Sequence, residues 1–449
     1  MSEDRALLLG REKTGKLLRQ YAMPAIVAMI ASSLYNIVDS IFIGQKLGAL
    51  AISGLALTFP FMNLAAAFGT LVGVGASTLV SIRLGQKDYC SARMVLGNVV
   101  LLNIIFGLSF SLLTLPFLTH ILYLFGGSEA TIEYARSFMA IILVGNVFTH
   151  LYFGLNAMLR ASGHPQKAMY VTIFSVFINI VLDALFILVF GWGIAGAAWA
   201  TVIAQFSALL WLVTIFLKRN KVLYFTKEIF RLKKKIVVDA LSIGLSPFLM
   251  NTAACFVVIL INSSLQKYGG DLAIGAYGII NRVAFVFVMI VLGLTQGMQP
   301  IVGYNYGAKL YPRVLEVLKT GIKVGVIVMT IAFILVEIFP GSISRAFTSD
   351  ETLIKIAVKG FRIVFCFFPI IGFQMVSSNF FQSIGQAKKS IFLSLTRQVI
   401  VLIPLLFILP HFLGIEGVWI SMPISDLVAT IITSVLIIKQ VKYFKSLGV

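Results

Sequence analysis

The sequence predicts an all-α polytopic membrane protein with twelve transmembrane helices in two six-helix lobes, related by a pseudo-twofold axis along the membrane normal. The composition is the first reason: 59% of the 449 residues are hydrophobic and 12% are charged, against about 25% charged in soluble domains. Twelve apolar stretches of membrane-spanning length are the second reason. An internal repeat is the third. A mean hydropathy of +0.98 leaves too much apolar surface for water-soluble domains.

Each membrane-spanning helix needs about 20 mostly apolar residues. Some of the stretches exceed this length, which indicates tilt or kinks, and several contain a proline that can bend the helix. The twelve predicted spans are 17–43, 51–82, 94–118, 135–158, 168–190, 194–217, 236–263, 272–300, 316–339, 353–380, 391–410 and 416–438.

Basic residues predict the orientation of the chain. Of the 36 Lys and Arg residues, 27 lie in alternate connections, whereas the opposite connections and their helix flanks carry six. Loops rich in Lys and Arg remain in the cytoplasm, so both termini are expected there. The net charge of +19 is then a topology signal and not a nucleic-acid-binding surface. The basic segments are 1–19, 83–93, 160–167, 218–235, 309–323, 388–389 and 439–445.

The two halves of the chain align with each other at one constant offset. Leu50-Ala51-Ile52 falls on Leu272-Ala273-Ile274, and Gly75 falls on Gly297. Six spans per half are an even number, so both halves enter the membrane from the same side, as in parallel repeats. We therefore expect an N-terminal lobe, a cytoplasmic basic linker with a short amphipathic helix, and a C-terminal lobe, at 1–217, 218–235 and 236–449.

Acidic residues inside spans occur unevenly in the two halves. Asp39 and Asp183 lie within spans one and five, but the equivalent positions of the second half are Ile261 and Leu405. A carboxylate at bilayer depth normally faces the protein interior or a water-filled cavity. Two carboxylates in one cavity repel each other when both are ionised, so the pair could share a proton or hold a cation. Structural polar packing is the alternative explanation.

Further polar residues share helix faces with these acids. On span five, Thr172, Ser175, Asn179 and Asp183 follow the spacing i, i+3, i+7, i+11, which is one helical face. Neighbouring polar residues on spans one, four and five are candidates for lining a substrate cavity. These candidates are Tyr35, Asn36, Asn156, Thr172 and Ser175.

The same positions carry a family resemblance. The chain resembles the multidrug and toxic compound extrusion (MATE) transporters over its whole length, and within them the DinF-type branch. That branch has an Asp in span one after a kink-forming Pro, an Asn-x-x-x-Asp pair in span five and a Thr in span six. Here these are Pro24 and Asp39, Asn179 and Asp183, and Thr201. The resemblance implies a cation or proton site at Asp39, Asn179, Asp183 and Thr201, with Pro24 as the hinge of its helix.

The resemblance also implies the activity. Such proteins export amphipathic, often cationic, organic compounds from the prokaryotic plasma membrane by antiport against H⁺ or Na⁺, through alternating access. The choice between the two ions stays open. A flippase for lipid-linked oligosaccharide or peptidoglycan precursors, from the same superfamily, is the alternative. No enzymatic activity, cofactor or metal beyond a coupling Na⁺ is expected, and a monomer, with the lipid bilayer and small organic substrates as partners, should suffice.

The C-terminal half has its own charged residues within spans. Asp426 lies in span twelve, Arg282 in span eight and Arg397 in span eleven. A buried acid is stable only when it is paired. We therefore expect Asp426 to pair with Arg282 or Arg397, either as a structural link or as part of substrate handling.

Overall fold

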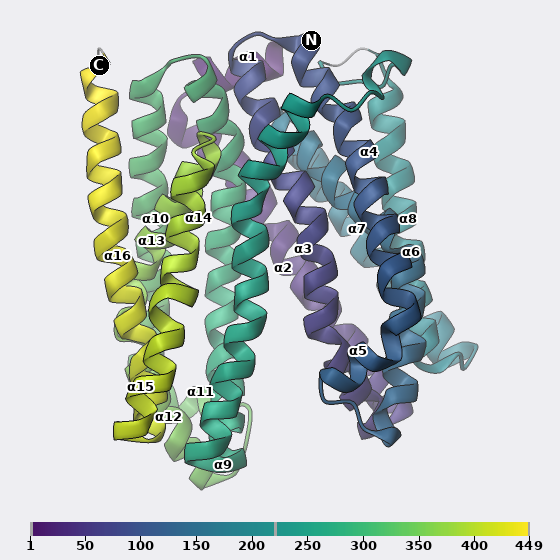
Figure 1. Cartoon of the computed structure of the whole chain (residues 1–449), viewed down its shortest axis with the longest axis vertical. Coiled ribbons are helices and arrows are strands. Elements are labelled where there is room, and N and C mark those ends of the chain that lie inside the picture. The colour runs from purple at the N-terminus through teal and green to yellow at the C-terminus, as the bar shows by residue number, and fades with distance from the viewer. Residues whose placement is uncertain (1–2, 220–221, 448–449) are drawn as a thin grey trace. The chain divides into compact units, whose positions relative to one another are not determined.

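The structure is a computed structural model and consists of helices and their connections (Figure 1). It describes the backbone of residues 3–219 and 222–447, and their side chains except those of residues 3–6, 36, 37 and 49. The chain divides into two compact units. The first contains α1 and Val27–Phe248, and the second contains Lys13–Ile26 with the chain from Leu249 onward.

The first unit contains the early helices of the chain. Figure 1 draws them in purple, blue and teal. They are α1 (Glu3–Arg11), most of α2 (Thr14–Leu47), α3 (Ala49–Gly85), α4 (Tyr89–Thr114), η1 (Leu115–Phe117), α5 (Leu118–Leu124), α6 (Glu129–Ala161), α7 (Pro165–Asp183), the π-helix η2 (Ala184–Val189), α8 (Gly193–Leu217), η3 (Lys227–Ile229) and the start of α9 (Lys234–Gly307).

The second unit contains the remainder of α9 and the helices that follow. Among these, α13 packs against α10, α14 and α16 (green to yellow in Figure 1). The elements after α9 are α10 (Tyr311–Ile338), α11 (Pro340–Arg345), α12 (Glu351–Phe365), α13 (Phe368–Ser383), α14 (Ala387–Leu395), the π-helix η4 (Thr396–Leu402), α15 (Ile403–Leu413) and α16 (Ile415–Ser446).

The described helices provide the predicted twelve spans. Ten of them are long and apolar enough to cross a membrane, and the pair α12 and α13, bent by 51°, provides one more. The 74-residue α9 contains a break at Gly270, where φ is +67°. Since glycine adopts positive φ without steric cost, the chain reverses there and α9 supplies two spans. The fold class predicted from the sequence is confirmed.

Backbone conformation repeats at the predicted offset. Lys87 and Lys309 have φ of 60° and 58°, and they are the positive-φ residues other than glycine in the described chain. Gly163 and Gly385 are likewise both left-handed. Non-glycine residues rarely adopt positive φ, so matching exceptions at equivalent positions of the two halves support a duplicated helix-turn design.

The first helix of each half is divided between the two units. Helix α2 changes unit between Ile26 and Val27, and α9 changes between Phe248 and Leu249. This differs from the uninterrupted lobes expected at 1–217 and 236–449. The starting segments of α2 and α9 are thus exchanged between the units. Glycines explain this exchange, because a residue without a side chain lets each starting segment come close to the backbone of the unit that it joins.

These glycine contacts are equivalent in the two units. In the first unit, a Cβ on Gly75 of α3 would lie 1.9 Å from the Ala240 carbonyl oxygen, and one on Gly244 would lie 1.7 Å from the Leu71 oxygen. In the second unit, a Cβ on Gly297 would lie 2.5 Å from the Cα of Ala22. Gly75 corresponds to Gly297, and Ala22 to Gly244, at the offset that relates the two halves.

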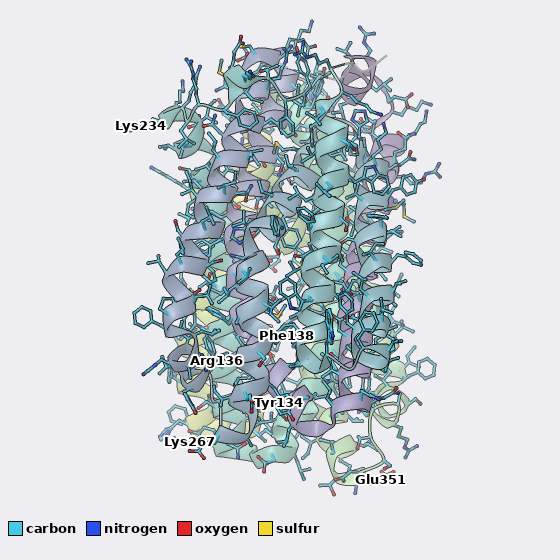
Figure 2. All side chains as sticks on the ribbon, turned by 90° about the vertical axis from the view of Figure 1, so that its right-hand side faces the viewer. Tyr134, Arg136, Phe138, Lys234, Lys267 and Glu351 are labelled. Atoms are coloured by element: carbon cyan, nitrogen blue, oxygen red, sulfur yellow. The ribbon has the colours of Figure 1, made fainter. Side chains whose placement is uncertain are left out.

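Helix α6 is central to the packing of the first unit, where it contacts α3, α4 and α8. Phe138 in its first half belongs to a buried apolar cluster with Phe61 of α3 and Leu122 of α5. Figure 2 shows Tyr134 and Phe138 toward one end of this unit and Lys234 near the other. The chain runs through three spans (α6, α7 and α8) between Tyr134 and Lys234. Because three is an odd number, the two residues are expected at opposite ends of the helices.

The basic connection after α8 lies against α4. Asn98 of α4 donates through Nδ2 to the carbonyl oxygen of Arg231 (3.0 Å) and accepts from the amide of Lys233 (3.0 Å). A Cβ on Gly97 would lie 2.1 Å from the oxygen of Ile229. The prediction of an amphipathic helix here is wrong. Between α8 and α9, the described residues contain one helical element, the three-residue η3. Side-chain hydrogen bonds from α4 take the place of helical bonds.

Replacing Asn98 by alanine should release this connection from α4. Two hydrogen bonds are lost, each contributing about 0.5–1.5 kcal/mol, so amide hydrogen exchange at residues 229–233 should accelerate by roughly tenfold or more. Asn98→Asp retains the oxygen that accepts from Lys233 but loses the donor, and should give an intermediate rate. Unchanged exchange in Asn98→Ala would contradict this account of the connection.

Candidate functional site

Four buried polar residues from three helices form the predicted ion site within the first unit. Asp39 lies on α2, Asn179 and Asp183 lie one turn apart on α7, and Thr201 lies on α8. Asp183 is completely inaccessible, and the other three are 3–7% exposed. The apolar spans place these side chains at membrane depth, where a charged group is stable only with a compensating partner.

Direct interactions join the four residues in two pairs, and Asn179 and Asp183 are one helical turn apart. The amide of Asn179 donates to the hydroxyl of Thr201 across α7 and α8, with Nδ2 and Oγ1 3.3 Å apart. The carboxyl groups of Asp39 and Asp183 lie within hydrogen-bonding and electrostatic range of each other. The structure therefore brings together the residues predicted from spans one, five and six.

Several oxygens of this site are buried without a donor among the described residues. These are Oδ1 of Asp39, Oδ1 of Asn179 and both carboxylate oxygens of Asp183. A buried acceptor without a partner is unfavourable by about 1–3 kcal/mol, and more for a charged group. A proton shared by the two carboxyl groups would supply one missing donor, and a hard cation such as Na⁺ prefers oxygen ligands of this kind. The residues fit either ion.

The helix that carries Asp183 changes geometry immediately after it. Residues Ala184–Val189 form the π-helix η2, in which backbone hydrogen bonds span five residues. A π-helix shifts the side chains that follow relative to a regular α-helix, and such segments occur frequently at functional sites. Apolar periodicity cannot reveal this feature, because ALFILV is apolar at every position.

Comparison with known proteins identifies the family. The MatE family model matches residues 24–185 and again residues 247–408. The chain belongs to this family. The starts of the two matches are separated by nearly the same offset as the repeat found in the sequence. The MATE resemblance of the sequence is confirmed.

Relatives and solved structures match almost the whole chain. The multidrug export protein MepA of Staphylococcus aureus (strain N315) is 27% identical over 95% of this chain and 94% of its own length. The MATE multidrug transporter DinF-BH, solved as a ligand complex, is 36% identical over 96% of both chains with a TM-score of 0.89. An outward-facing multidrug resistance MATE transporter of the MOP superfamily shares the fold, with TM-score 0.93 over 98% of both chains and 24% identity.

The predicted cavity-lining residues of this MatE protein differ in their surroundings. Asn156 donates to the Ala168 carbonyl oxygen (3.0 Å) and approaches the hydroxyl of Thr172 (3.4 Å), so these two link α6 to α7. Ser175 is also buried, at 8% exposure, and Tyr35 is half-buried on α2. The side chain of Asn36 lies outside the described residues.

Two neighbours of this link were not selected from the sequence. Tyr152 donates to the hydroxyl of Thr172 (3.1 Å), and Arg160 donates to the side-chain oxygen of Asn156. In the sequence, Arg160 stands out only as one of the basic residues of the predicted cytoplasmic connection 160–167. The i, i+4, i+8 spacing of Tyr152, Asn156 and Arg160 on one helix face is the signal that could have identified them.

Pro24, the predicted hinge, lies on α2 two residues before the point where that helix passes from the second unit to the first. Proline cannot donate the backbone hydrogen bond that a helix interior needs, which lowers resistance to bending. The same helix carries Asp39 about four turns further along.

Proposed function

We propose that this MatE protein is a cation-coupled antiporter that exports amphipathic, often cationic, organic compounds by alternating access, driven by H⁺ or Na⁺. The observation that carries the proposal is the pair of buried carboxyl groups, Asp39 and Asp183, whose oxygens lack donors among the described residues. The names of MepA and DinF-BH add support for drugs as substrates.

Ion binding would act on α2. When both carboxylates are ionised they repel each other, and a proton or Na⁺ between them removes the repulsion. Asp39 can then approach Asp183 more closely. Because Asp39 and Pro24 belong to one helix, a change at Asp39 is transmitted about 22 Å along α2 to Lys13–Ile26, the segment that packs in the second unit.

The driving force is adequate for this role. Each positive charge that moves inward across the membrane releases about 2.3 kcal/mol per 100 mV, in addition to any concentration gradient. Coupling requires that substrate and ion favour different conformations, because a ligand shifts a conformational equilibrium only by its difference in affinity. Asp39 and Asp183 would bind the ion more tightly in the conformation in which their carboxyl groups are close together, which provides the difference in affinity for the ion. We further propose a plasma-membrane location, cytoplasmic termini and a functional monomer.

Transport of a cationic dye in proteoliposomes tests the proposal. Under a pH gradient and, separately, a Na⁺ gradient, one of the two should drive movement of rhodamine 6G by the wild-type protein, and dissipating that gradient should stop it. Dye movement that ignores both gradients would contradict ion coupling. If neither gradient moves any of several cationic dyes, a lipid-linked saccharide becomes the substrate to test, as expected for a flippase.

A further inference from the structure

The charged groups outside the proposed coupling site differ in whether they are neutralised. In the second unit, Arg397 of η4 donates through Nε to Oδ1 of Asp426 on α16 at 2.6 Å, whereas Arg282 is exposed on α9. The partner of Asp426 is therefore Arg397, and the two charges cancel. The basic connection between α8 and α9 in the first unit is different. None of its described lysines and arginines forms an ion pair with a described acid.

This connection lies against α4 at the depth where that helix enters the membrane. Its backbone at Arg231 and Lys233 is hydrogen-bonded to the side chain of Asn98, and Ile229 packs on the same helix. The predicted span of α4 begins at residue 94, so Asn98 lies about 6 Å inside its start. The headgroup region of one leaflet is about 5–8 Å thick. The connection is therefore held at the level of the lipid headgroups.

The buried and the exposed side chains of the connection differ in chemistry. The buried ones are apolar, with Val222, Leu223 and Ile229 at 1–7% exposure. Phe230 and Leu232 are apolar but 39% and 49% exposed. The exposed basic residues beside them are Lys227, Arg231, Lys233, Lys234 and Lys235. Apolar contact and attraction to anionic lipid are the two contributions that bind a segment to a bilayer surface, and this segment offers both.

Arg93 of α4 adds a positive charge that is fixed in position. Its Nη1 donates to the hydroxyl of Tyr224 (2.7 Å), and its guanidinium carbon lies 4.7 Å from the centroid of the same ring. Its Nε is buried and has no acceptor among the described residues. Residues 222–235 contain five basic residues and a single acid, Glu228. The charge of this surface therefore stays positive, and at headgroup depth the anion that it would meet is a lipid phosphate.

We propose that Arg93 and the connection 222–235 form a binding surface for anionic phospholipids, with Phe230 and Leu232 at the start of the acyl chains. Guanidinium donors bind phosphate strongly, and basic residues near a membrane surface are attracted to anionic lipid. The basic connections are expected on the cytoplasmic side, where the leaflet is anionic. The proposal goes beyond export and does not depend on it.

Binding of lipids with a fluorescent acyl chain to the purified full-length protein, in a non-ionic detergent, tests the proposal. Fluorescence polarisation compares anionic phosphatidylglycerol with zwitterionic phosphatidylcholine of the same acyl chains. The decisive variant removes three exposed charges of the connection: Lys227→Gln/Arg231→Gln/Lys233→Gln. The matched control removes three exposed charges of α16: Lys439→Gln/Lys442→Gln/Lys445→Gln. None of the six side chains forms an ion pair with a described residue, so both variants should fold.

The wild type should prefer phosphatidylglycerol, and the variant of the connection should bind that lipid about tenfold or more weakly. Its binding of phosphatidylcholine should stay within about twofold of the wild type, and the α16 variant should match the wild type for both lipids. Equal affinity of the wild type for the two lipids, equal loss in both variants, or no loss in the variant of the connection would overturn the proposal. An equal concentration of inorganic phosphate should not displace the lipid, because phosphate lacks acyl chains. Displacement would assign the surface to free phosphate and overturn the lipid assignment.

A further variant separates the position of the connection from its charge. Asn98→Ala keeps every basic residue but loses the two hydrogen bonds that hold the connection at headgroup depth. Its binding of phosphatidylglycerol should weaken by about threefold or more. Binding as tight as that of the wild type would show that a loose basic segment suffices, and would overturn the surface built on α4.

Discussion

Replacing Asp39 by asparagine should abolish ion-driven export while leaving the protein folded in the membrane. Asparagine has nearly the same shape as a protonated aspartic acid but cannot release a proton or supply an anionic ligand. The side chain next to Asp183 would then stay permanently in its neutral form. Gradient-driven dye transport in proteoliposomes should fall by at least tenfold, to the level of protein-free vesicles.

The control for this change is the same substitution at an exposed acid. Asp271 is exposed and lies next to the break of α9. The Asp271→Asn variant should therefore transport the dye normally. Asp183→Asn should resemble Asp39→Asn, and the double variant should be no worse than either, since residues that act as one unit are non-additive. Full transport by Asp39→Asn would remove Asp39 from the mechanism.

Replacing Gly244 by alanine should destabilise the protein through the exchanged start of α9. Its Cβ would lie 1.7 Å from the Leu71 carbonyl oxygen, so α9 and α3 would have to separate. Overpacking of this kind typically destabilises by about 1–3 kcal/mol, which exceeds the gain of up to about 1 kcal/mol from higher helix propensity. The melting temperature in detergent should fall by several degrees.

Gly278, on the second span of α9, provides the matched control. Apart from its chain neighbours and the adjacent backbone of its own helix, no described atom lies within 4 Å of the Cβ that an alanine would place there. Gly278→Ala should therefore leave the melting temperature unchanged or raise it, because only the propensity term remains. If the melting temperature fell in both Gly244→Ala and Gly278→Ala, or in neither, the close approach of α9 to α3 would not be what limits stability.

Local patterns in the sequence were sufficient for much of the fold. The length and hydropathy of the spans follow from the thickness of the bilayer, so each span can be recognised by itself. The face of α7 that carries Thr172, Ser175, Asn179 and Asp183 also follows from helical periodicity, and all four are buried in the structure. One prediction that failed was the amphipathic helix in the connection 218–235, whose conformation depends on Asn98, a residue far away in the chain.

The amino-acid sequence by itself determined the span count, the repeat and the residue types of the proposed ion site, because these depend on neighbours within a few helical turns and on the bilayer. Only the tertiary structure decided that Asp39 meets Asp183, that Asp426 pairs with Arg397 and not with Arg282, and that the starts of α2 and α9 are exchanged between units. These results depend on packing between distant segments. A single sequence records no pairwise contact between residues so far apart, and close approach at a glycine such as Gly75 becomes visible only when the opposing backbone is in place.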